Sequence, residues 1–191
     1  GVDELAPEPL GVGNAAHEQR QLDVQGELMD TLYVARKFHL EPDDDAWRFQ
    51  KTMLEQLARD WNKPDEGIWE IRSGKRHFTH SRMMCWAAFD RGIKAVENQG
   101  LTGPVERWRV LRDTIHADVC RHGWNPDKQA FVQYYGGNAL DASLLLMAEV
   151  GFLPSEDPRF VGTVEAIERE LTVDGLVLRY RDEPLWPEGW Q

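Results

Sequence analysis

The sequence has few cysteines, no long apolar run and no extended basic segment, and each absence argues against a class of protein. Its 191 residues include only two cysteines, Cys85 and Cys120, which is too few for a disulfide scaffold. No stretch approaches the roughly 20 consecutive apolar residues of a membrane span, and no signal peptide is recognisable at its start. We therefore expect free thiols in a reducing compartment, a cytoplasmic location and no membrane partner.

Positive charge is also scarce. The formal net charge is −11, and the one short basic cluster consists of Arg72, Lys75 and Arg76. Nucleic-acid binding requires a basic face, because much of its affinity comes from neutralising backbone phosphates. No glycine-rich phosphate loop follows a predicted strand. We therefore expect no nucleic-acid partner, no nucleotide and no other cofactor.

Apolar residues recur at helical spacing in six segments, which predicts an all-α fold. No fixed-period repeat is present and no composition shift divides the chain, so residues 1–191 are expected to form a single domain of paired antiparallel helices. A short strand is expected within residues 124–137, and the Asp-Gly pair at 174–175 predicts a tight hairpin turn. The expected helices span residues 19–38, 43–61, 79–96, 104–123, 138–147 and 155–171.

Residues that favour helix N-termini stand before four of these segments, and the acids at positions 43–45 offer an N-cap for the second helix. Thr79 or Ser81 is expected to cap the third helix, Asn138 the fifth and Ser155 the last. Asp141 follows Asn138 at the third position, which is a variant of the capping box.

The segment PDEGIWE, residues 64–70, carries three carboxylates, Asp65, Glu66 and Glu70, in a loop that also holds Trp69. A glutamic acid beside an indole loses water, which raises its pKa and lets it stay protonated as a proton donor. The alternative is a solvated acidic loop in which the Trp69 ring only fills a gap in the core. The spacing alone leaves both interpretations open.

Three segments together resemble glycoside hydrolase family 15, the glucoamylase-like and trehalase group. The first is GIWEIRSGKRHFT around Glu70, and the others are GNAAHEQRQLDVQGELMDTLY at 13–33 and FVQYYGGNALDASLLLMAEVGFL at 131–153. The resemblance runs in order along nearly the whole chain. It implies an (α/α)6 toroid that hydrolyses α-glucosidic bonds with inversion, Glu70 as the general acid, and Trp69 packed beside the substrate sugar.

The sequence departs from the family pattern in two ways. Fungal glucoamylases have an Asp three residues before the acid and a Glu directly after it, where this chain has Gly67 and Ile71. This moves the match toward the bacterial and archaeal branch, in which substrate specificities are mixed. The resemblance also covers only the central portion of the enzyme, about half of the toroid, and the family's catalytic base is expected on a later segment, outside this chain.

Several other residues are candidates for the site, each with a plain structural alternative. Trp124 and Tyr134 can stack on sugar rings or pack in the core. Arg72 and the residues that follow it, Lys75, Arg76 and His77, can bind sugar hydroxyls or form a solvated turn.

Gln21 and Asp23 are expected to point into the cavity, as the matching family segment does. His77 and His80 have a metal-site spacing without a further ligand, so no metal is predicted.

Two functions of different classes follow. The first is the acid-bearing part of an α-glycosidase, and the second is a non-catalytic helical module that binds carbohydrate or protein. Inverting hydrolysis needs a second carboxylate about 6.5–9.5 Å from the acid, so we expect the isolated chain to be inactive. Helices that lack their toroid neighbours expose apolar stripes, so we also expect self-association.

Overall fold

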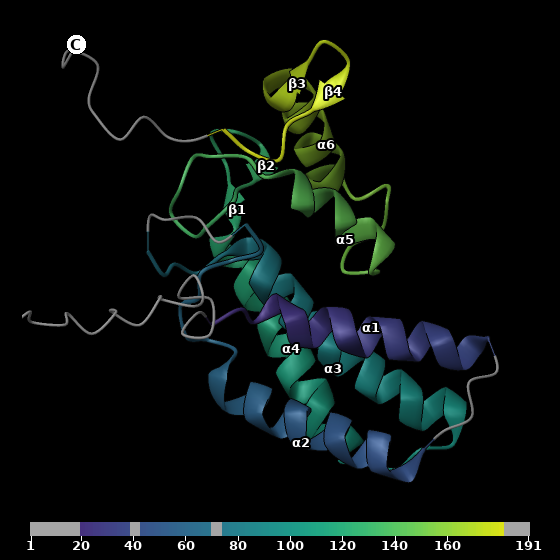
Figure 1. Ribbon diagram of the computed structural model, residues 1–191. Coiled ribbons are helices and arrows are strands. Elements are labelled where there is room, and N and C mark those ends of the chain that lie inside the picture. The colour runs from purple at the N-terminus through teal and green to yellow at the C-terminus, as the bar shows by residue number, and fades with distance from the viewer. Residues whose placement is uncertain (1–19, 39–42, 70–73, 182–191) are drawn as a thin grey trace, which may run out of the picture.

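The computed structural model describes residues 20–38, 43–69 and 74–181 of the chain, and helices dominate these ranges (Figure 1). The α-helices are α1 (Asp23–Lys37), α2 (Asp44–Asp60), α3 (Thr79–Gln99), α4 (Val105–His122), α5 (Leu146–Glu149) and α6 (Pro158–Leu171), with a 3-10 helix η2 (Ala142–Leu145) before α5. The strands are β1 (Trp124–Asn125), β2 (Ala130–Phe131), β3 (Thr172–Val173) and β4 (Leu176–Val177). Six α-helices in the described ranges agree with the prediction.

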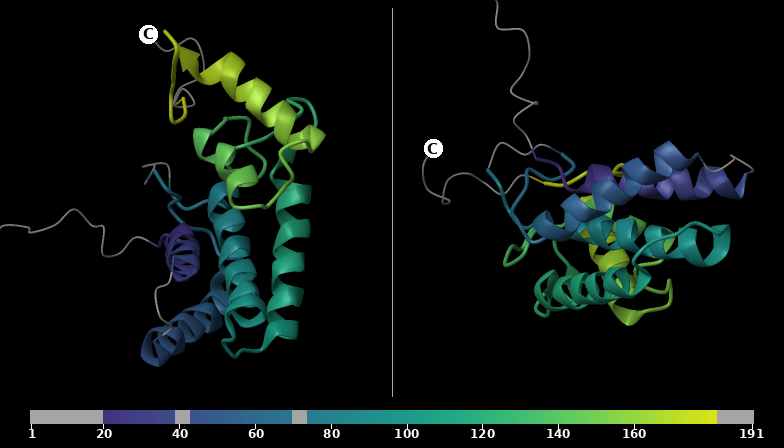
Figure 2. Two further views of the ribbon diagram at one scale, coloured as in Figure 1. Left: turned by 90° about the vertical axis from the view of Figure 1, so that its right-hand side faces the viewer. Right: turned by 90° about the horizontal axis from the view of Figure 1, so that it is seen from below.

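Helix α3 is the central element of the fold. It lies between α1 and α4, and α2 packs against the same group (Figure 2). Every residue from 79 to 93 is buried, polar ones included. A helix that is buried on all sides occupies the interior of a helical assembly, whereas the amphipathic α2 presents one apolar face to it. The second group, η2, α5 and α6 with the two hairpins, lies at one end of these helices (Figure 1).

The structure contains two β-hairpins in its described residues, one where a hairpin turn was predicted and one where only a short strand was predicted. Strands β1 and β2 pair antiparallel with Trp124 opposite Phe131, within the region expected to contain a short strand. Strands β3 and β4 also pair antiparallel, and their turn has positive φ at Asp174 (51°) and Gly175 (78°). Positive φ at both central residues is what a type I′ hairpin turn requires, and Asp-Gly supplies it at low cost.

The predicted cap of the fifth helix is wrong. The residue before η2 is Asp141, whose side chain accepts a hydrogen bond from the Ser143 backbone N–H. The Asn138 side chain instead accepts a hydrogen bond from Asn125, so it ties the helix approach to β1. The sequence offered two capping residues three positions apart, and the pairing of Asn138 with Asn125 removes one of them.

The caps predicted for the third and last helices are also wrong. Helix α6 is capped by Asp157, which accepts from the Arg159 backbone N–H, and Pro158 occupies the first helical position, where its missing donor costs nothing. Ser155 lies two residues too early. The Thr79 hydroxyl donates to the Val132 carbonyl oxygen at 2.5 Å and does not cap α3, because the chain after β2 runs directly beside the start of that helix.

The two thiols are both free. Cys85 is buried in α3 and Cys120 is half-buried in α4. Burial raises the pKa of Cys85 to about 12, so it stays a neutral thiol at ordinary pH. Among the described helices, none is long and apolar enough to cross a membrane.

Candidate functional site

The loop between α2 and α3 contains the predicted proton donor, and its two ends are joined at the base. Asp65 and Arg76 exchange two backbone hydrogen bonds, at 3.0 Å and 2.9 Å, as an isolated antiparallel bridge. Glu70 and Arg72, the predicted acid and one predicted sugar contact, lie outside the described residues. Their predicted roles therefore rest on the sequence, and the structure describes what holds the loop on either side of them.

The first half of this loop is bound to the residues that lead into α1. Arg20 and Glu66 are connected twice, by the Arg20 N–H to the Glu66 carboxylate at 2.7 Å and by the Glu66 N–H to the Arg20 carbonyl at 3.0 Å. The Gln21 side-chain amide donates to the Gly67 carbonyl at 3.3 Å. Gln21, expected to point into the cavity, thus contacts the acid-bearing loop.

Two buried carboxyl groups, Asp65 and Asp23, lie under this contact. Asp65 is fully buried, accepts from the Leu22 N–H at 3.3 Å, and lies 3.9 Å from a nitrogen of the fully buried Arg82. Burial raises the pKa of Asp65, and burial together with the Asp65 charge raises that of Asp23 to about 6. Asp65 therefore fixes the base of the loop to α1 and α3 and is unavailable to a ligand.

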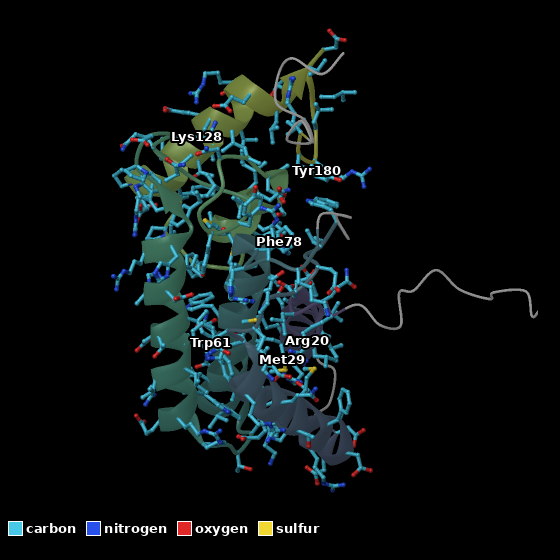
Figure 3. The ribbon with its side chains drawn as sticks, turned by 90° about the vertical axis from the view of Figure 1, so that its left-hand side faces the viewer. Arg20, Met29, Trp61, Phe78, Lys128 and Tyr180 are labelled. Carbon is cyan, nitrogen blue, oxygen red and sulfur yellow. The ribbon has the colours of Figure 1, made fainter. Side chains whose placement is uncertain are left out.

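Trp69 anchors the loop next to the predicted acid. Its indole Nε1–H lies 3.0 Å and 3.1 Å from the two carboxylate oxygens of Asp141, a residue 72 positions later in the chain. The Arg179 guanidinium lies over the indole ring, 5.2 Å from its centroid, and the Tyr180 ring is 6.5 Å away. Figure 3 shows Arg20 before α1 and Tyr180 after β4, with Phe78 between them in that view.

The two other aromatic candidates have internal contacts. Trp124 packs edge-on against Phe131 at 5.3 Å and joins the apolar core. Tyr134 lies under the Arg76 guanidinium at 4.1 Å and meets the edge of the Phe78 ring at 6.2 Å. These contacts favour the packing alternative at both positions, and Tyr134 remains close to the acid-bearing loop through Arg76.

The remaining polar candidates are also held within the chain. Lys75 lies 3.4 Å from Glu66, which gives the loop a partly buried ion pair across its two sides. His80 is almost fully buried, and burial lowers its pKa to about 4. Within residues 20–38, 43–69 and 74–181, no three His, Cys, Asp or Glu side chains gather into a metal-binding group.

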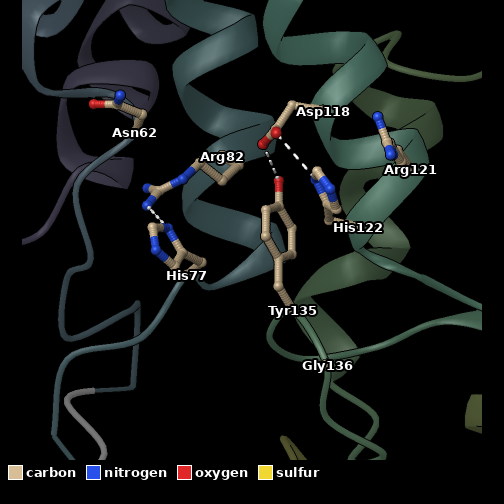
Figure 4. Close-up of a pocket in the computed structure, with 8 residues that line it drawn as sticks. All are labelled: Asn62, His77, Arg82, Asp118, Arg121, His122, Tyr135 and Gly136. Atoms are coloured by element: carbon tan, nitrogen blue, oxygen red, sulfur yellow. Dashed lines mark hydrogen bonds and ion pairs between the residues drawn. The ribbon is translucent and has the colours of Figure 1, made fainter.

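A pocket of about 520 Å³ opens beside the base of the loop (Figure 4). It is lined by Asn62, His77, Arg82, Asp118, Arg121, His122, Tyr135 and Gly136. This set includes His77 among the sequence-based candidates and none of the predicted aromatic contacts.

Hydrogen bonds within the pocket fix the state of His77. Arg82 lies 2.7 Å from Nδ1 of His77, and because a guanidinium only donates, this ring nitrogen is the acceptor. Burial and the Arg82 charge lower the pKa of His77, which favours the neutral ring. Asp118 accepts from the Tyr135 hydroxyl at 2.9 Å and lies 3.1 Å from His122. The pocket side chains therefore bond mainly to one another.

Sequence reasoning missed the role of Asp141 as the partner of Trp69. The Asp was assigned to a helix start, which is correct for its contact with Ser143 but leaves its second function unseen. No local pattern connects residues 72 positions apart, and only the folded chain brings them together.

Comparison with known proteins places the chain among glycosidases. The model of the family described as Glycosyl hydrolases family 15 matches residues 7–186. A trehalase from Mycobacterium tuberculosis is 46% identical over 173 residues, and a trehalase from Thermoplasma acidophilum is 39% identical over 176 residues. A solved glycosidase in complex with glucose superposes with a TM-score of 0.75 at 20% identity, over 85% of this chain.

The matched region is a part of each relative. These alignments cover 91% and 92% of this chain but 25% and 30% of the two trehalases, and the structural match covers 43% of the glycosidase chain. The structural likeness shows the fold class that the sequence predicted, the all-α toroid of paired helices, of which this chain provides a part.

Proposed function

The chain belongs to glycosyl hydrolase family 15, and on this premise we propose that it carries the general acid of an α-glucosidic hydrolysis that proceeds with inversion. Glu70 donates the proton to the leaving oxygen, and the sugar binds on the side of the loop where Trp69 lies. The match to the family over residues 7–186 carries the proposal, because it includes the whole acid-bearing loop. The trehalase names of the relatives favour an α-linked diglucoside, trehalose, as the substrate.

The contacts of the loop support this assignment of roles. An inverting enzyme needs a protonated acid and a separate carboxylate that activates water from the opposite face of the sugar. Asp65 is fully buried beside Arg82, and Glu66 is bound to Arg20 and Lys75, so neither suits the base. We assign the base to a residue outside this sequence, and the isolated chain is then inactive.

The test compares the 191-residue chain with the uninterrupted gene product on trehalose, maltose and isomaltose. We expect the gene product to release glucose, with NMR showing one β-glucose and one α-glucose from each trehalose at first, because inversion occurs at only one of its two anomeric carbons. Glu70→Gln should lower kcat by roughly 10²- to 10⁴-fold, as loss of a general acid does. Glu66→Gln is the matched control, because it neutralises a carboxylate of the same loop and should retain most of the activity.

Two results would contradict the proposal. Full activity of the Glu70→Gln gene product would remove Glu70 from the reaction. Glucose release by the isolated chain, abolished by Glu70→Gln, would show that the chain already contains its base.

The alternative function, a non-catalytic module for carbohydrate or protein, gains less support. Sugar-binding modules present free aromatic faces. Here an arginine lies over the ring of Tyr134, and Trp124 packs against Phe131. Binding of trehalose by the chain with no turnover by the gene product would favour this alternative.

A further inference from the structure

We infer that Asp141 is a positioning residue for the proposed reaction, because it holds the indole of Trp69 and thereby the part of the loop from which Glu70 extends. The inference rests on the proposed function of Glu70. It concerns a residue that is far from the acid in sequence and that acts through Trp69, without contact to the substrate.

The carboxylate of Asp141 is held rigidly. It is 2% exposed and accepts hydrogen bonds from the Trp69 indole, the Gln133 amide at 3.1 Å, the Ser143 backbone N–H at 2.8 Å and the Ser143 hydroxyl at 2.6 Å. The two Ser143 donors reach Oδ1, the Gln133 amide reaches Oδ2, and the indole N–H is shared between both oxygens, so each carboxylate oxygen is bonded. Within the described residues, no Lys or Arg ion pair is found for Asp141, so neutral donors stabilise its charge and each has a defined direction.

Helix capping does not explain this arrangement. The capping of η2 requires the Ser143 backbone N–H alone. The donors from Trp69 and Gln133 come from two other segments, the acid-bearing loop and the chain after β2, and they direct the carboxylate toward the loop. Asp141 thus joins three parts of the fold at one buried point.

The segment after β4 closes around the same point. Asp141 and Tyr180 form an isolated antiparallel bridge, and the Ala142 N–H donates to the Arg179 carbonyl at 2.8 Å. This places the Arg179 guanidinium over the Trp69 ring. The indole is therefore fixed along its N–H edge by Asp141 and on one face by Arg179.

Fixing Trp69 constrains Glu70 through covalent geometry. Consecutive Cα atoms lie about 3.8 Å apart across a trans peptide bond, so a shift of Trp69 moves the backbone origin of Glu70 with it. Catalytic groups must be held within about 0.5 Å of their productive position, and a misplacement of 1 Å can cost about 10²-fold in rate. Loss of the Asp141 contact is therefore expected to reduce kcat more than substrate binding.

The first test measures the contact itself in the 191-residue chain. The ¹H–¹⁵N spectrum resolves indole N–H signals, and Trp69→Phe identifies the signal of Trp69. We expect Asp141→Asn to move this signal upfield and to speed its exchange with solvent, because the charged acceptor is lost. Ser143→Ala, the control, removes another donor to the same carboxylate and should leave the signal in place. An unchanged signal in Asp141→Asn, or an equal shift in Ser143→Ala, would overturn the inference.

The second test measures catalysis in the uninterrupted gene product. We expect Asp141→Asn to lower kcat roughly tenfold to hundredfold with KM changed less than about twofold. If Asp141 acts through Trp69, adding Asp141→Asn to Trp69→Phe should cost no more than about another twofold, because neighbours that act as a unit are not additive. If the double variant instead loses kcat by the product of the two single losses, Asp141 has a general structural role and the inference is overturned.

The two tests separate this inference from the proposed function. A wild-type gene product without glycosidase activity would refute the proposed function and the catalytic role of Asp141 with it. The indole signal would still decide whether the Asp141–Trp69 contact exists.

Discussion

Replacing Asp23 by Asn should stabilise the chain at pH 8 and leave its stability at pH 4 nearly unchanged. Asp23 stands in the first turn of α1, is 4% exposed, and one of its carboxylate oxygens has no hydrogen-bond partner among the described residues. The charges of Asp65 and Glu27 lie nearby. The folded chain therefore favours the protonated, neutral form of this side chain.

The magnitude follows from the change in pKa on folding. Burial raises the pKa of Asp23 from 3.8 to about 6. Below pH 4 the group is protonated in both states and contributes no difference. Between pH 4 and 6 the folded state holds a proton that the unfolded state has lost, so stability falls as pH rises, by about 3 kcal/mol in all. Asn cannot ionise, so Asp23→Asn should recover much of this loss above pH 6.

The assay is urea unfolding followed by circular dichroism from pH 4 to pH 8 for the wild-type chain and the variant. Asp60→Asn is the matched control. The hydrogen bond from Lys63 and the charge of Arg20 lower the pKa of Asp60, so its ionised form stabilises the fold above the unfolded pKa, and this variant should lose stability at pH 8. A loss of stability at pH 8 in Asp23→Asn, comparable to that of Asp60→Asn, would refute the reasoning, since it would mean that the Asp23 charge is stabilised in the fold.

Two further predictions concern packing and association. Gly26→Ala should destabilise the chain by about 2 kcal/mol or more in the same unfolding assay, because the added Cβ would lie 2.2 Å from the Met84 carbonyl oxygen, which is backbone. Gly92→Ala should cost less, because its nearest contact, at 2.8 Å, is the terminal methyl of the Leu54 side chain. The chain should self-associate at tens of micromolar, as measured by light scattering. Leu176→Lys and Val177→Lys should weaken this association, because these side chains are 73% and 50% exposed in strand β4. A monomeric wild-type chain would contradict the second prediction.

The helices and the second hairpin could be predicted because their signals are local. Apolar residues at helical spacing determine which side of a helix is buried, and the Asp174-Gly175 pair determines a turn through backbone conformations available to few other residues. These signals require no knowledge of distant segments. The outline of the helical domain therefore followed from the sequence, and helix ends were off by a few residues.

The caps were less predictable because several residues compete for each helix start. Asn138 and Asp141 are both good caps, and the choice depended on Asn125, whose position is known only after β1 has formed. Thr79 is a good cap by type, but a carbonyl of a neighbouring segment, that of Val132, binds its hydroxyl. Tertiary contacts decided both cases.

The candidate site was predictable in its residue types and unpredictable in its supports. The carboxylate-rich loop and its tryptophan are visible as a segment of the sequence. The side chains that hold the loop come from elsewhere, with Asp141 72 positions after Trp69 and Arg20 46 positions before Glu66. Contacts across such separations have no periodic signature, so sequence reasoning named the loop and could not name what fixes it.

One departure from the fungal family pattern has a physical explanation in these supports. Gly67 has a φ of 69°, in the region that disfavours side chains, and a Cβ there would lie 2.8 Å from the Phe78 ring. Its carbonyl oxygen also accepts the amide of Gln21. An Asp at this position would have to push Phe78 away from the loop and adopt a strained backbone. The glycine is thus a requirement of how this loop is folded against α3 and the start of α1, and it sets the path by which the chain reaches Trp69 and the proposed acid.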